Sequence, residues 1–581
     1  MSAFKFDTAY RPMVMGTRHM VSAGHYLAAH AGFLILEAGG NAIDAGVAAG
    51  ITLNVVEPQM CSFTGVAPIM IYVAQEDALV TIDGLGTWPR RATCDLLRRA
   101  NAACVPEGIL QTVVPGAPDA WLTALERYGT MSFADIAYSA IRLARDGFPT
   151  YPMMALTIKR KLEDFPPGSA AAAIFLPHGR PPEQGEMFVQ TDLARTLQHL
   201  ADVDKAARAK GRAAAIGAVR DVIYRGDLAQ TFAAFQRANG GLLDEQDLAS
   251  YSVSLDRPVS VDYRGVDLYA CGPWCQGPML LQIVRMADAL RPEQHSHNSP
   301  AYIHTLIETY KLVAADREAF YGDPKFMDVP LDILLSADYA IARAKQVRQD
   351  CAWPEMPAPG EIVGRGHRTS SARLEAHMPA LAGTGPLDTS YVCTVDAAGN
   401  AFSATPSDGV MRKSPVVPGT GMALSPRGIQ SRLDPHHPAS VAPGKRPRLT
   451  PNPAIAIRRG EFVMPFGTPG GDLQVQAMSQ VFLNMMTFGM DAQAAVESTR
   501  FYSYSYPDSF APHAYYPGLV KLEEPLMAPA ADALRRFGHK VEAWPDNEWP
   551  RTGVCAVVDD KRRGLKFGAA DSRRTSYALG W

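Results

Sequence analysis

The sequence predicts a layered α/β protein in which helices cover two sets of strands. Three observations support this prediction: strand signals among helices in the first 150 residues, a mostly helical stretch from about 118 to 350, and a strand-rich region after residue 389. A Pro- and Gly-rich segment at about 351–388 is typical of an exposed connection. Strands on both sides of this connection, with helices to cover them, favour an α/β sandwich.

The first 150 residues contain both kinds of element. In LEAGGNAIDAGVAAG, Gly39 and Gly40 stand where a helix should stop, and a second helix should begin near Asn41. The strings APIMIYV and ALVTIDG alternate around turn residues and predict a hairpin of two core strands. Charges and glycines interrupt the apolar region 28–56, which therefore predicts a buried helical layer and not a membrane span.

The middle of the chain is predicted to be helical and the last third to be rich in sheet. Apolar residues recur every three to four positions in PDAWLTALERYG, FADIAYSAIRLARDG, TDLARTLQHLADV and SPAYIHTLIETYKLVAADREAFYG. One strand, VSVDYRGVDLYACG, interrupts these helices. After residue 389 the period changes toward two in YVCTVD, NAFSAT, PAIAIRRGEFVMPFG and GVCAVVDD, with a helix around DLQVQAMSQVFLNMMTFG.

Composition indicates an ordinary globular chain. Its 581 residues are 47% hydrophobic, and this length and hydrophobic content allow a sizeable core. The formal net charge is −3. This balance predicts neither a nucleic-acid partner nor an anionic membrane partner. The opening string MSAFKFDTAYRPMVMG lacks the apolar region of a signal peptide, so we expect a cytoplasmic protein.

The cysteines and histidines do not form a metal-binding pattern. The 8 cysteines are scattered without paired CxxC spacing, so we expect reduced, buried thiols. His436 and His437 lie between prolines and are predicted to be polar loop residues. We therefore expect no metal and no cofactor.

Thr389 is the most informative residue. It follows a Gly- and Pro-containing segment and opens a β-rich stretch in GPLDTSYVCTVDAAGNAFSATPSDG. This arrangement suits a self-processing N-terminal nucleophile, because cleavage between Asp388 and Thr389 would free the threonine's α-amine to act as the base for its own hydroxyl. The chain would then be a proenzyme.

Two further features could assist such a nucleophile. The string GTPGG at 467–471 could supply backbone N–H donors to an oxyanion, although most Gly-Gly pairs are turns. Ser407 follows Thr389 at a spacing that fits a hairpin or a neighbouring strand, where it could orient the amine; a surface serine is the alternative.

The chain resembles the γ-glutamyltransferase (γ-glutamyltranspeptidase) family over nearly its whole length, from about residue 20 to the C-terminus. The resemblance rests on motifs that occur in the expected order. They are LEAGGNAIDAGVAAG, VVPGAPDAWLTALERYGTM, ARDGF, NGGLLDEQDLASY, DYRG, DREAFYGDP, DTSY with VDAAGN, GKRP with TPNP, and GTPGGD.

The resemblance implies a four-layer αββα fold of the N-terminal nucleophile type. It also implies autocatalytic cleavage into a large subunit, 1–388, and a small subunit, 389–581, which stay associated; a dimer of such pairs is left open. By the same resemblance the site residues take family roles. These are Thr389 as nucleophile, Ser407 as the second hydroxyl, Gly470 and Gly471 as the oxyanion hole, and Thr450 as the second of two substrate-contacting hydroxyl positions.

The departures from the family pattern concern the substrate. Leu85 stands where the family's γ-glutamyl enzymes have an arginine for the α-carboxylate, and Gln430 stands nearest to the aspartate that holds the α-amino group. Leu449 replaces the first of the paired serines, Gly409 replaces an asparagine, and SFTGVAPIM replaces a glycine-rich segment. Since both charges of an amino-acid head group lose their partners, the pocket should prefer another small-molecule amide.

Three hypotheses follow. The first is a self-processing amidohydrolase or acyltransferase acting on a small amide or N-acyl compound, similar to oxamate amidohydrolase or to β-lactam acylases. The second is a true γ-glutamyl transferase or glutathione hydrolase that uses other anchors. The third is an unprocessed, inactive protein that keeps the fold for binding or assembly.

Several other residues are candidates for the pocket wall. Trp88, Trp274 and Gln276 lie in DGLGTWP and CGPWCQGP, which by resemblance approach the site, although core tryptophans are an equal alternative. Lys445 and Arg446 could receive a carboxylate or could lie in a surface loop.

Overall fold

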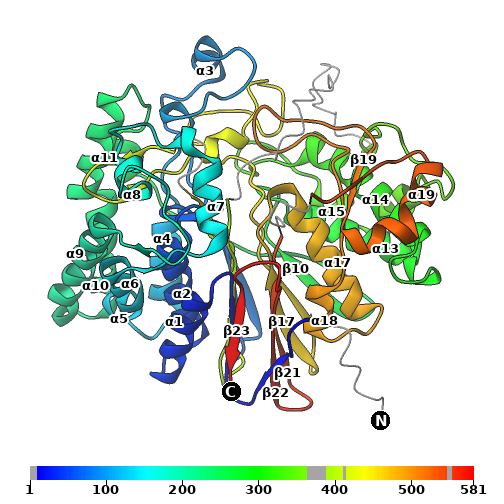
Figure 1. Ribbon diagram of the computed structural model, residues 1–581, viewed down its shortest axis with the longest axis horizontal. Coiled ribbons are helices and arrows are strands. Elements are labelled where there is room, and N and C mark those ends of the chain that lie inside the picture. Colours follow the sequence, from blue (N-terminus) through cyan, green and yellow to red (C-terminus); the bar gives the residue numbers. More distant parts are fainter. Residues whose placement is uncertain (1–8, 363–387, 410–413, 546–551) are drawn as a thin grey trace.

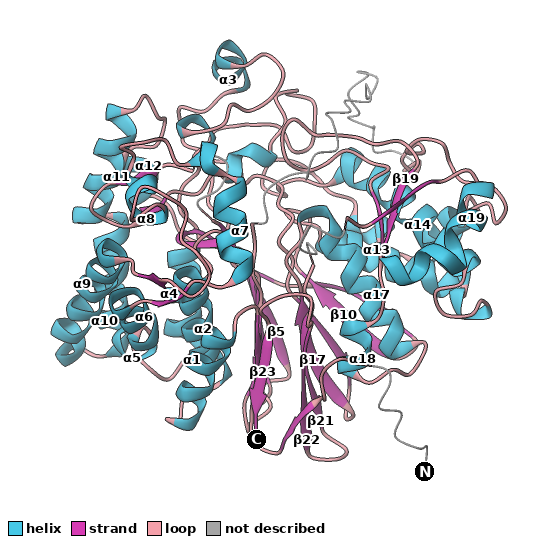
Figure 2. Ribbon diagram, viewed as in Figure 1, coloured by secondary structure: helices cyan, strands magenta, loops and turns pink. Residues whose placement is uncertain are grey.

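The computed structural model describes residues 9–362, 388–409, 414–545 and 552–581. Two seven-stranded sheets pack between two helical layers, and the strands occupy the centre of the molecule in Figures 1 and 2. This is the predicted four-layer αββα sandwich. The predicted connection at 351–388 lies largely outside the described residues.

The first sheet is antiparallel, with the order β1-β22-β21-β17-β16-β10-β9. In that order its strands are Val14–Gly16, Leu565–Ala570, Cys555–Asp560, Phe462–Gly467, Ala454–Arg458, Val266–Ala270 and Val259–Tyr263. The second sheet is also antiparallel, with the order β23-β2-β11-β12-β4-β5-β8. Its strands are Tyr577–Gly580, Met20–Ala23, Val392–Val395, Ala401–Ala404, Ile69–Val73, Ala78–Ile82 and Leu255–Asp256.

Each sheet combines strands from both sides of the gap at 363–387. In the second sheet, β11 and β12 lie between β2 and β4. Two strands that follow the gap are therefore inserted between two strands that precede it. Hydrogen bonds between these strands hold the two parts of the chain together. A break between residues 388 and 389 would therefore leave two polypeptides that share both sheets.

One helical layer packs on the second sheet through a continuous apolar core. Its main helices are α1 Tyr26–Glu37, α2 Ala42–Val56, α4 Ala117–Tyr128, α6 Tyr138–Asp146, α9 Thr191–Ala207 and α10 Arg212–Tyr224. The other layer packs on the first sheet. It contains α13 Gly277–Leu290, α14 Pro300–Phe320, α17 Gln474–Met486 and α18 Ala492–Glu497. The two layers lie on opposite sides of the strands (Figure 2).

Shorter elements complete the described chain. The remaining α-helices are α3 Cys94–Ala100, α5 Phe133–Ile136, α7 Pro152–Arg160, α8 Ala170–Phe175, α11 Asp227–Ala238, α12 Glu245–Ala249, α15 Leu331–Leu334, α16 Ala337–Ala344 and α19 Met527–Arg536. The remaining strands are β3 Cys61–Val66, β6 Phe148–Pro149, β7 Met187–Phe188, β13 Ser407–Asp408, β14 Val416–Val417, β15 Met422–Ala423, β18 Phe501–Ser503, β19 Leu519–Leu522 and β20 Lys540–Ala543. None of the described helices is long and apolar enough to cross a membrane.

Several local predictions are confirmed, and two are wrong. Asn41 caps α2 in a capping box with Asp44, and β4 and β5 form the predicted hairpin. The single strand predicted in VSVDYRGVDLYACG is instead a hairpin of β9 and β10. Arg264 and Gly265 both have positive φ, 52° and 81°, as a two-residue type I′ turn requires. Not every cysteine is a buried thiol, since Cys351 is exposed.

His25 joins the end of β2 to α1 and is buried. Its Nδ1 accepts the backbone N–H of Leu27 at 3.2 Å and caps α1. Burial lowers the pKa of His25 from 6.5 to about 3, because the imidazolium would lose its hydration. Neutral His25 therefore stabilises the fold above pH 6.5, and this contribution is lost as the pH falls toward 3.

The substitution His25→Asn should reduce the acid sensitivity of the fold, since asparagine also caps helices but does not titrate. Below pH 6.5 the wild-type free energy of unfolding should fall with pH more steeply than that of the variant, by about 1.4 kcal/mol per pH unit. Denaturant unfolding across this pH range measures the difference. His30→Asn, which replaces an exposed histidine of α1, is the control. Parallel profiles for wild type and His25→Asn would contradict the assignment.

Candidate active site

Thr389 lies at the centre of the second sheet, just before β11. It is fully buried, and its φ of 151° is rarely adopted by a β-branched residue. The hairpin of β11 and β12 pairs Val392 with Ala404, and the N–H of Ser390 donates to the Pro406 carbonyl at 2.8 Å. The same antiparallel register places Thr389 opposite Ser407.

The two hydroxyls are in direct contact. Thr389 Oγ1 lies 2.8 Å from Ser407 Oγ, and Ser407 Oγ also lies within hydrogen-bond distance, 3.2 Å, of the Asp388 carbonyl oxygen. Asp388 and Thr389 are the predicted cleavage site, and Ser407 is the predicted second hydroxyl. One short set of hydrogen bonds therefore connects the threonine hydroxyl with the carbonyl of the peptide bond that precedes it.

Arg427 is a further member of this site that the sequence analysis missed. Its Nη2 donates to Ser407 Oγ at 2.5 Å and forms an ion pair with Asp388 Oδ2 at 3.3 Å, and its Nε donates to Asp408 Oδ1 at 2.6 Å. Because a guanidinium has no acceptor, the Ser407 hydroxyl must accept from Arg427 and give its own proton to Thr389 or Asp388. A charged residue in the string SPRGIQ, three positions before Gln430, was the available signal.

The Gly470–Gly471 turn follows β17 and precedes α17. Both glycines have positive φ, 132° and 58°, which a residue with a side chain would adopt only under strain. Gly467, at the end of β17, packs against the ring of Tyr391; a Cβ at Gly467 would lie 2.3 Å from a ring carbon. The end of β17 is therefore held against the segment that leads from Thr389 into β11.

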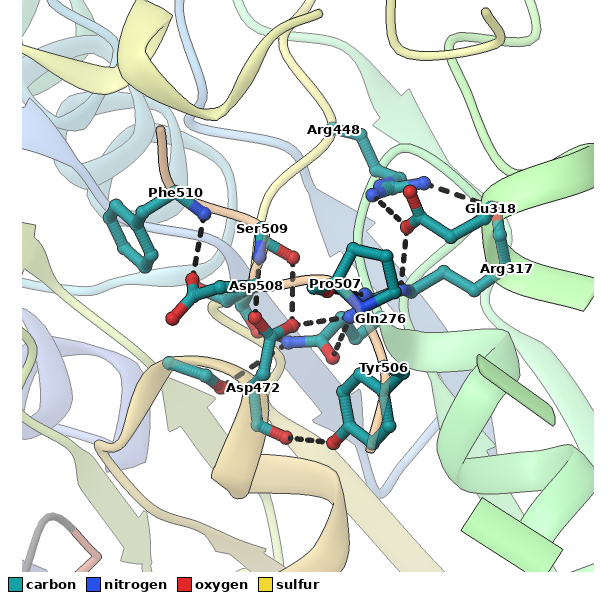
Figure 3. Close-up of polar contacts among 12 residues, drawn as sticks. Gln276, Arg317, Glu318, Arg448, Asp472, Tyr506, Pro507, Asp508, Ser509 and Phe510 are labelled. Carbon is teal, nitrogen blue, oxygen red and sulfur yellow. Dashed lines mark hydrogen bonds and ion pairs between the residues drawn. The ribbon is translucent and has the colours of Figure 1, made fainter. Parts of the chain in front are cut away.

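Asp472 anchors this turn from its C-terminal side (Figure 3). Its carboxylate accepts the Ser509 N–H at 2.6 Å and the Ser509 hydroxyl at 2.7 Å, and it forms a buried ion pair with Arg317. Burial alone would lower the pKa of Arg317, but the Asp472 and Glu318 carboxylates outweigh burial and raise it overall. Arg317 therefore remains a cation in the interior.

The pocket residues predicted from the sequence fall into two groups. Gln276 Nε2 lies 3.3 Å from the carbonyl oxygens of both Thr450 and Gly471, and Gln430 Nε2 donates to Thr450 Oγ1 at 3.1 Å. These four residues form one hydrogen-bonded chain. Gln430 Oε1 also accepts from Arg427 Nη1 at 3.3 Å, which connects this chain to the Thr389 site.

Leu85 and Trp274 belong to the second group, because both are buried in the apolar cluster between the two sheets. The backbone carbonyl of Trp274 accepts the N–H of Leu449 at 2.9 Å. The indole ring of Trp274 lies against the Arg446 guanidinium. Trp88 is buried in a separate cluster and donates its indole N–H to Ser431 at 2.9 Å. The two tryptophans therefore take part in core packing.

Lys445 and Arg446 are buried, so the surface-loop alternative is wrong. Arg446 forms ion pairs with Asp83 and Asp323 at 2.9 and 2.7 Å, and Lys445 Nζ donates to the Pro438 carbonyl at 2.7 Å. His437, predicted to be a polar loop residue, is largely buried and lies 3.4 Å from Glu318. Burial lowers the pKa of His437 to about 4.

Within the described ranges, His304, Glu308 and His539 could offer donor atoms to a metal ion. Most of their donor atoms already have partners, the exception being His539 Nδ1. Glu308 forms an ion pair with Lys311 at 2.6 Å, His304 Nδ1 lies 2.8 Å from His539 Nε2, and His304 Nε2 lies 2.6 Å from the Arg348 carbonyl. The Lys311 ammonium supplies the positive charge that a metal would bring, so the Glu308 carboxylate is already neutralised in this buried cluster.

The profile of the gamma-glutamyltranspeptidase family matches residues 28–581. The chain is 31% identical to the glutathione hydrolase-like YwrD proenzyme of Bacillus subtilis, covering 98% of this chain and 99% of the relative. It is 30% identical to the acylase ACY 1 proenzyme of Pseudomonas sp. strain SE83, covering 99% and 96%.

A solved structure agrees with the fold. The cephalosporin acylase from Bacillus halodurans superimposes with a TM-score of 0.84 at 28% sequence identity, covering 100% of this chain and 99% of that structure. The relatives thus include glutathione hydrolases and acylases, both of which act on amide bonds.

Replacing Asp472 with asparagine should destabilise the protein, because it leaves the buried Arg317 guanidinium without one of its carboxylates. We expect the free energy of unfolding to fall by about 3 kcal/mol. Chemical denaturation measures this loss. Asp532→Asn, at an ion pair whose aspartate is 85% exposed, should change stability by less than about 1 kcal/mol. Equal effects of the two substitutions would show that Asp472 does not anchor the turn.

Proposed function

The chain belongs to the gamma-glutamyltranspeptidase family, and we propose that it is a self-processing hydrolase or acyltransferase with Thr389 as the nucleophile. The observation that carries this proposal is the contact of Thr389 Oγ1 with Ser407 Oγ, which in turn reaches the Asp388 carbonyl oxygen. The substrate is a small amide or an N-acyl compound. This arrangement supports the proposal, because nucleophilic catalysis requires a hydroxyl that neighbouring groups orient toward the carbonyl it attacks.

The first proposed reaction is cleavage of the chain itself. Thr389 Oγ1 attacks the Asp388 carbonyl carbon, the bond to the Thr389 nitrogen breaks, and the hydroxyl proton reaches that nitrogen. This acyl shift frees the amine of Thr389, and water then hydrolyses the resulting ester to a carboxylate on Asp388 and the hydroxyl of Thr389. Cleavage also removes the constraint on φ of Thr389, whose unfavourable conformation costs on the order of 1–3 kcal/mol.

The second proposed reaction uses the mature site. The α-amine of Thr389 takes the proton of its own hydroxyl, Oγ1 attacks the amide carbonyl, and the N–H groups of Gly470 and Gly471 receive the developing oxyanion. The α-ammonium group of Thr389 returns this proton to the amine of the substrate, which departs, and water releases the acid from the ester on Thr389. Ser407 orients the threonine, and the Arg317–Asp472 ion pair holds the glycine turn.

The pocket favours an acyl group other than γ-glutamyl. Leu85 is packed in an apolar cluster and offers no charge to an α-carboxylate. Gln430 is neutral, so it cannot form an ion pair with an α-ammonium group. Relatives named as acylases support this reading. Relatives named as glutathione hydrolases support the second candidate, a γ-glutamyl enzyme with other anchors.

Mass spectrometry of the purified protein tests processing. Wild type should separate under denaturing conditions into fragments 1–388 and 389–581, whereas Thr389→Ala should remain one chain because it lacks the attacking oxygen. Thr389→Ser should still be cleaved, since it keeps a hydroxyl at the same position. A wild-type chain that stays intact after long incubation would support the third hypothesis, an inactive protein with a binding role.

Assays of the processed enzyme separate the two enzymatic candidates. We expect hydrolysis of simple amides with kcat/KM at least about tenfold above that for glutathione, because a γ-glutamyl head group finds no ionic partner at Leu85 or Gln430. Rapid turnover of glutathione would reverse this order and establish the γ-glutamyl enzyme instead.

A further inference from the structure

Arg427 is a buried cation that touches the catalytic hydroxyl system directly. Its side chain is 1% exposed and contacts two carboxylates, those of Asp408 and Asp388. The two carboxylates differ in their attachment. Asp408 belongs to β13 and is also bound by the Ser425 hydroxyl at 2.5 Å, whereas Asp388 precedes the bond that the proposed reaction breaks.

Other buried arginines near the site are committed to pairs within the fold. Arg317 pairs with Asp472, Arg448 pairs with Glu318 at 2.6 Å, and Arg446 pairs with Asp83 and Asp323. None of these carboxylates is adjacent to the proposed cleavage point. Arg427 therefore differs from them, because cleavage detaches one of its two carboxylate partners from Thr389.

Asp388 also shows what kind of acyl group this site accommodates. In the ester formed during processing, the acyl group on Thr389 Oγ1 is that of Asp388, and it occupies the place that a substrate acyl group takes during turnover. The side-chain carboxylate of Asp388 lies 3.3 Å from Arg427 Nη2 and is 9% exposed, so it lies nearer to solvent than Arg427. Withdrawal of Asp388 would free the side of Nη2 that faces it, while Nη2 keeps its contacts with Ser407 and Asp408.

We propose that Arg427 is the specificity-determining residue of the mature enzyme and binds a carboxylate on the acyl part of the substrate. This inference rests on the proposed function. The substrate class is the monoamide of a short dicarboxylic acid. In Asp388 two carbons separate the carboxylate from the reacting carbonyl, so a succinyl-like spacing fits the site. Asp408 holds the guanidinium in place through Nε and Nη2, and Gln430 holds it through Nη1.

The chemistry of recognition is that of a desolvated ion pair. A guanidinium presents paired N–H donors that match a carboxylate, and burial strengthens their attraction. A neutral acyl group of the same shape would place an apolar methyl group against Nη2 of Arg427, which would keep only Asp408 and Ser407 as partners. Replacing a carboxylate partner of a buried guanidinium with a methyl group is unfavourable, so the enzyme should discriminate against the neutral acyl group.

The experiment compares succinamate with butyramide, in which a methyl group replaces the carboxylate. Ammonia release by processed wild-type enzyme should give a kcat/KM ratio of roughly 30-fold or more in favour of succinamate. Arg427→Gln should reduce the ratio to below about 3, chiefly through a higher KM for succinamate, and Arg427→Lys should restore part of it. Arg99→Gln, at an exposed arginine of α3, should keep the wild-type ratio.

The outcomes distinguish this inference from the function on which it rests. A processed wild-type enzyme that hydrolyses both amides equally, prefers butyramide, or hydrolyses neither overturns the role of Arg427 and leaves processing intact. If Arg427→Gln fails to fold or to be cleaved, the kcat/KM ratio of the wild-type enzyme for succinamate over butyramide still tests the inference. A wild-type chain that is never cleaved at Thr389 overturns both the inference and the proposed function.

Discussion

The antiparallel pairing of β11 with β12 is the constraint on which the site depends. Its register places Thr389 opposite Ser407, so two hydroxyls that are 18 residues apart lie 2.8 Å from each other. A shift of one residue would turn Ser407 to the other face of the sheet. Because β11 and β12 lie between β2 and β4, neighbouring strands on both sides hold this register. The sandwich thereby fixes the geometry of the proposed nucleophile.

Buried charges complete the site, and each is compensated. Arg427 and Asp408 support the hydroxyl pair, while Arg317 and Asp472 support the Gly470–Gly471 turn. Charges removed from water are tolerated only when they are paired and hydrogen-bonded. Asp388 differs from Asp408, because it is a second carboxylate partner of Arg427 in the uncleaved chain and lies at the proposed cleavage point. Processing and substrate recognition would then use the same cation.

Sequence reasoning succeeded where local signals determine structure. The Asn41 cap and the β4–β5 hairpin follow from residue type and alternation, and the fold class follows from the order of elements. The turn at Arg264 and Gly265 was missed, because an arginine with positive φ is uncommon and the apolar pattern continues through it. Arg427 was missed because its importance depends on contacts with Asp388, Ser407 and Asp408 that no spacing rule gives.

The most direct test of the account is to locate the acyl group during turnover. The processed enzyme would be mixed with the amide that it hydrolyses fastest, quenched with acid and analysed by peptide mass mapping. The account predicts an added mass equal to the acyl group on the peptide that begins with Thr389. Turnover with the acyl group on any other residue would contradict the assignment of Thr389 as the nucleophile.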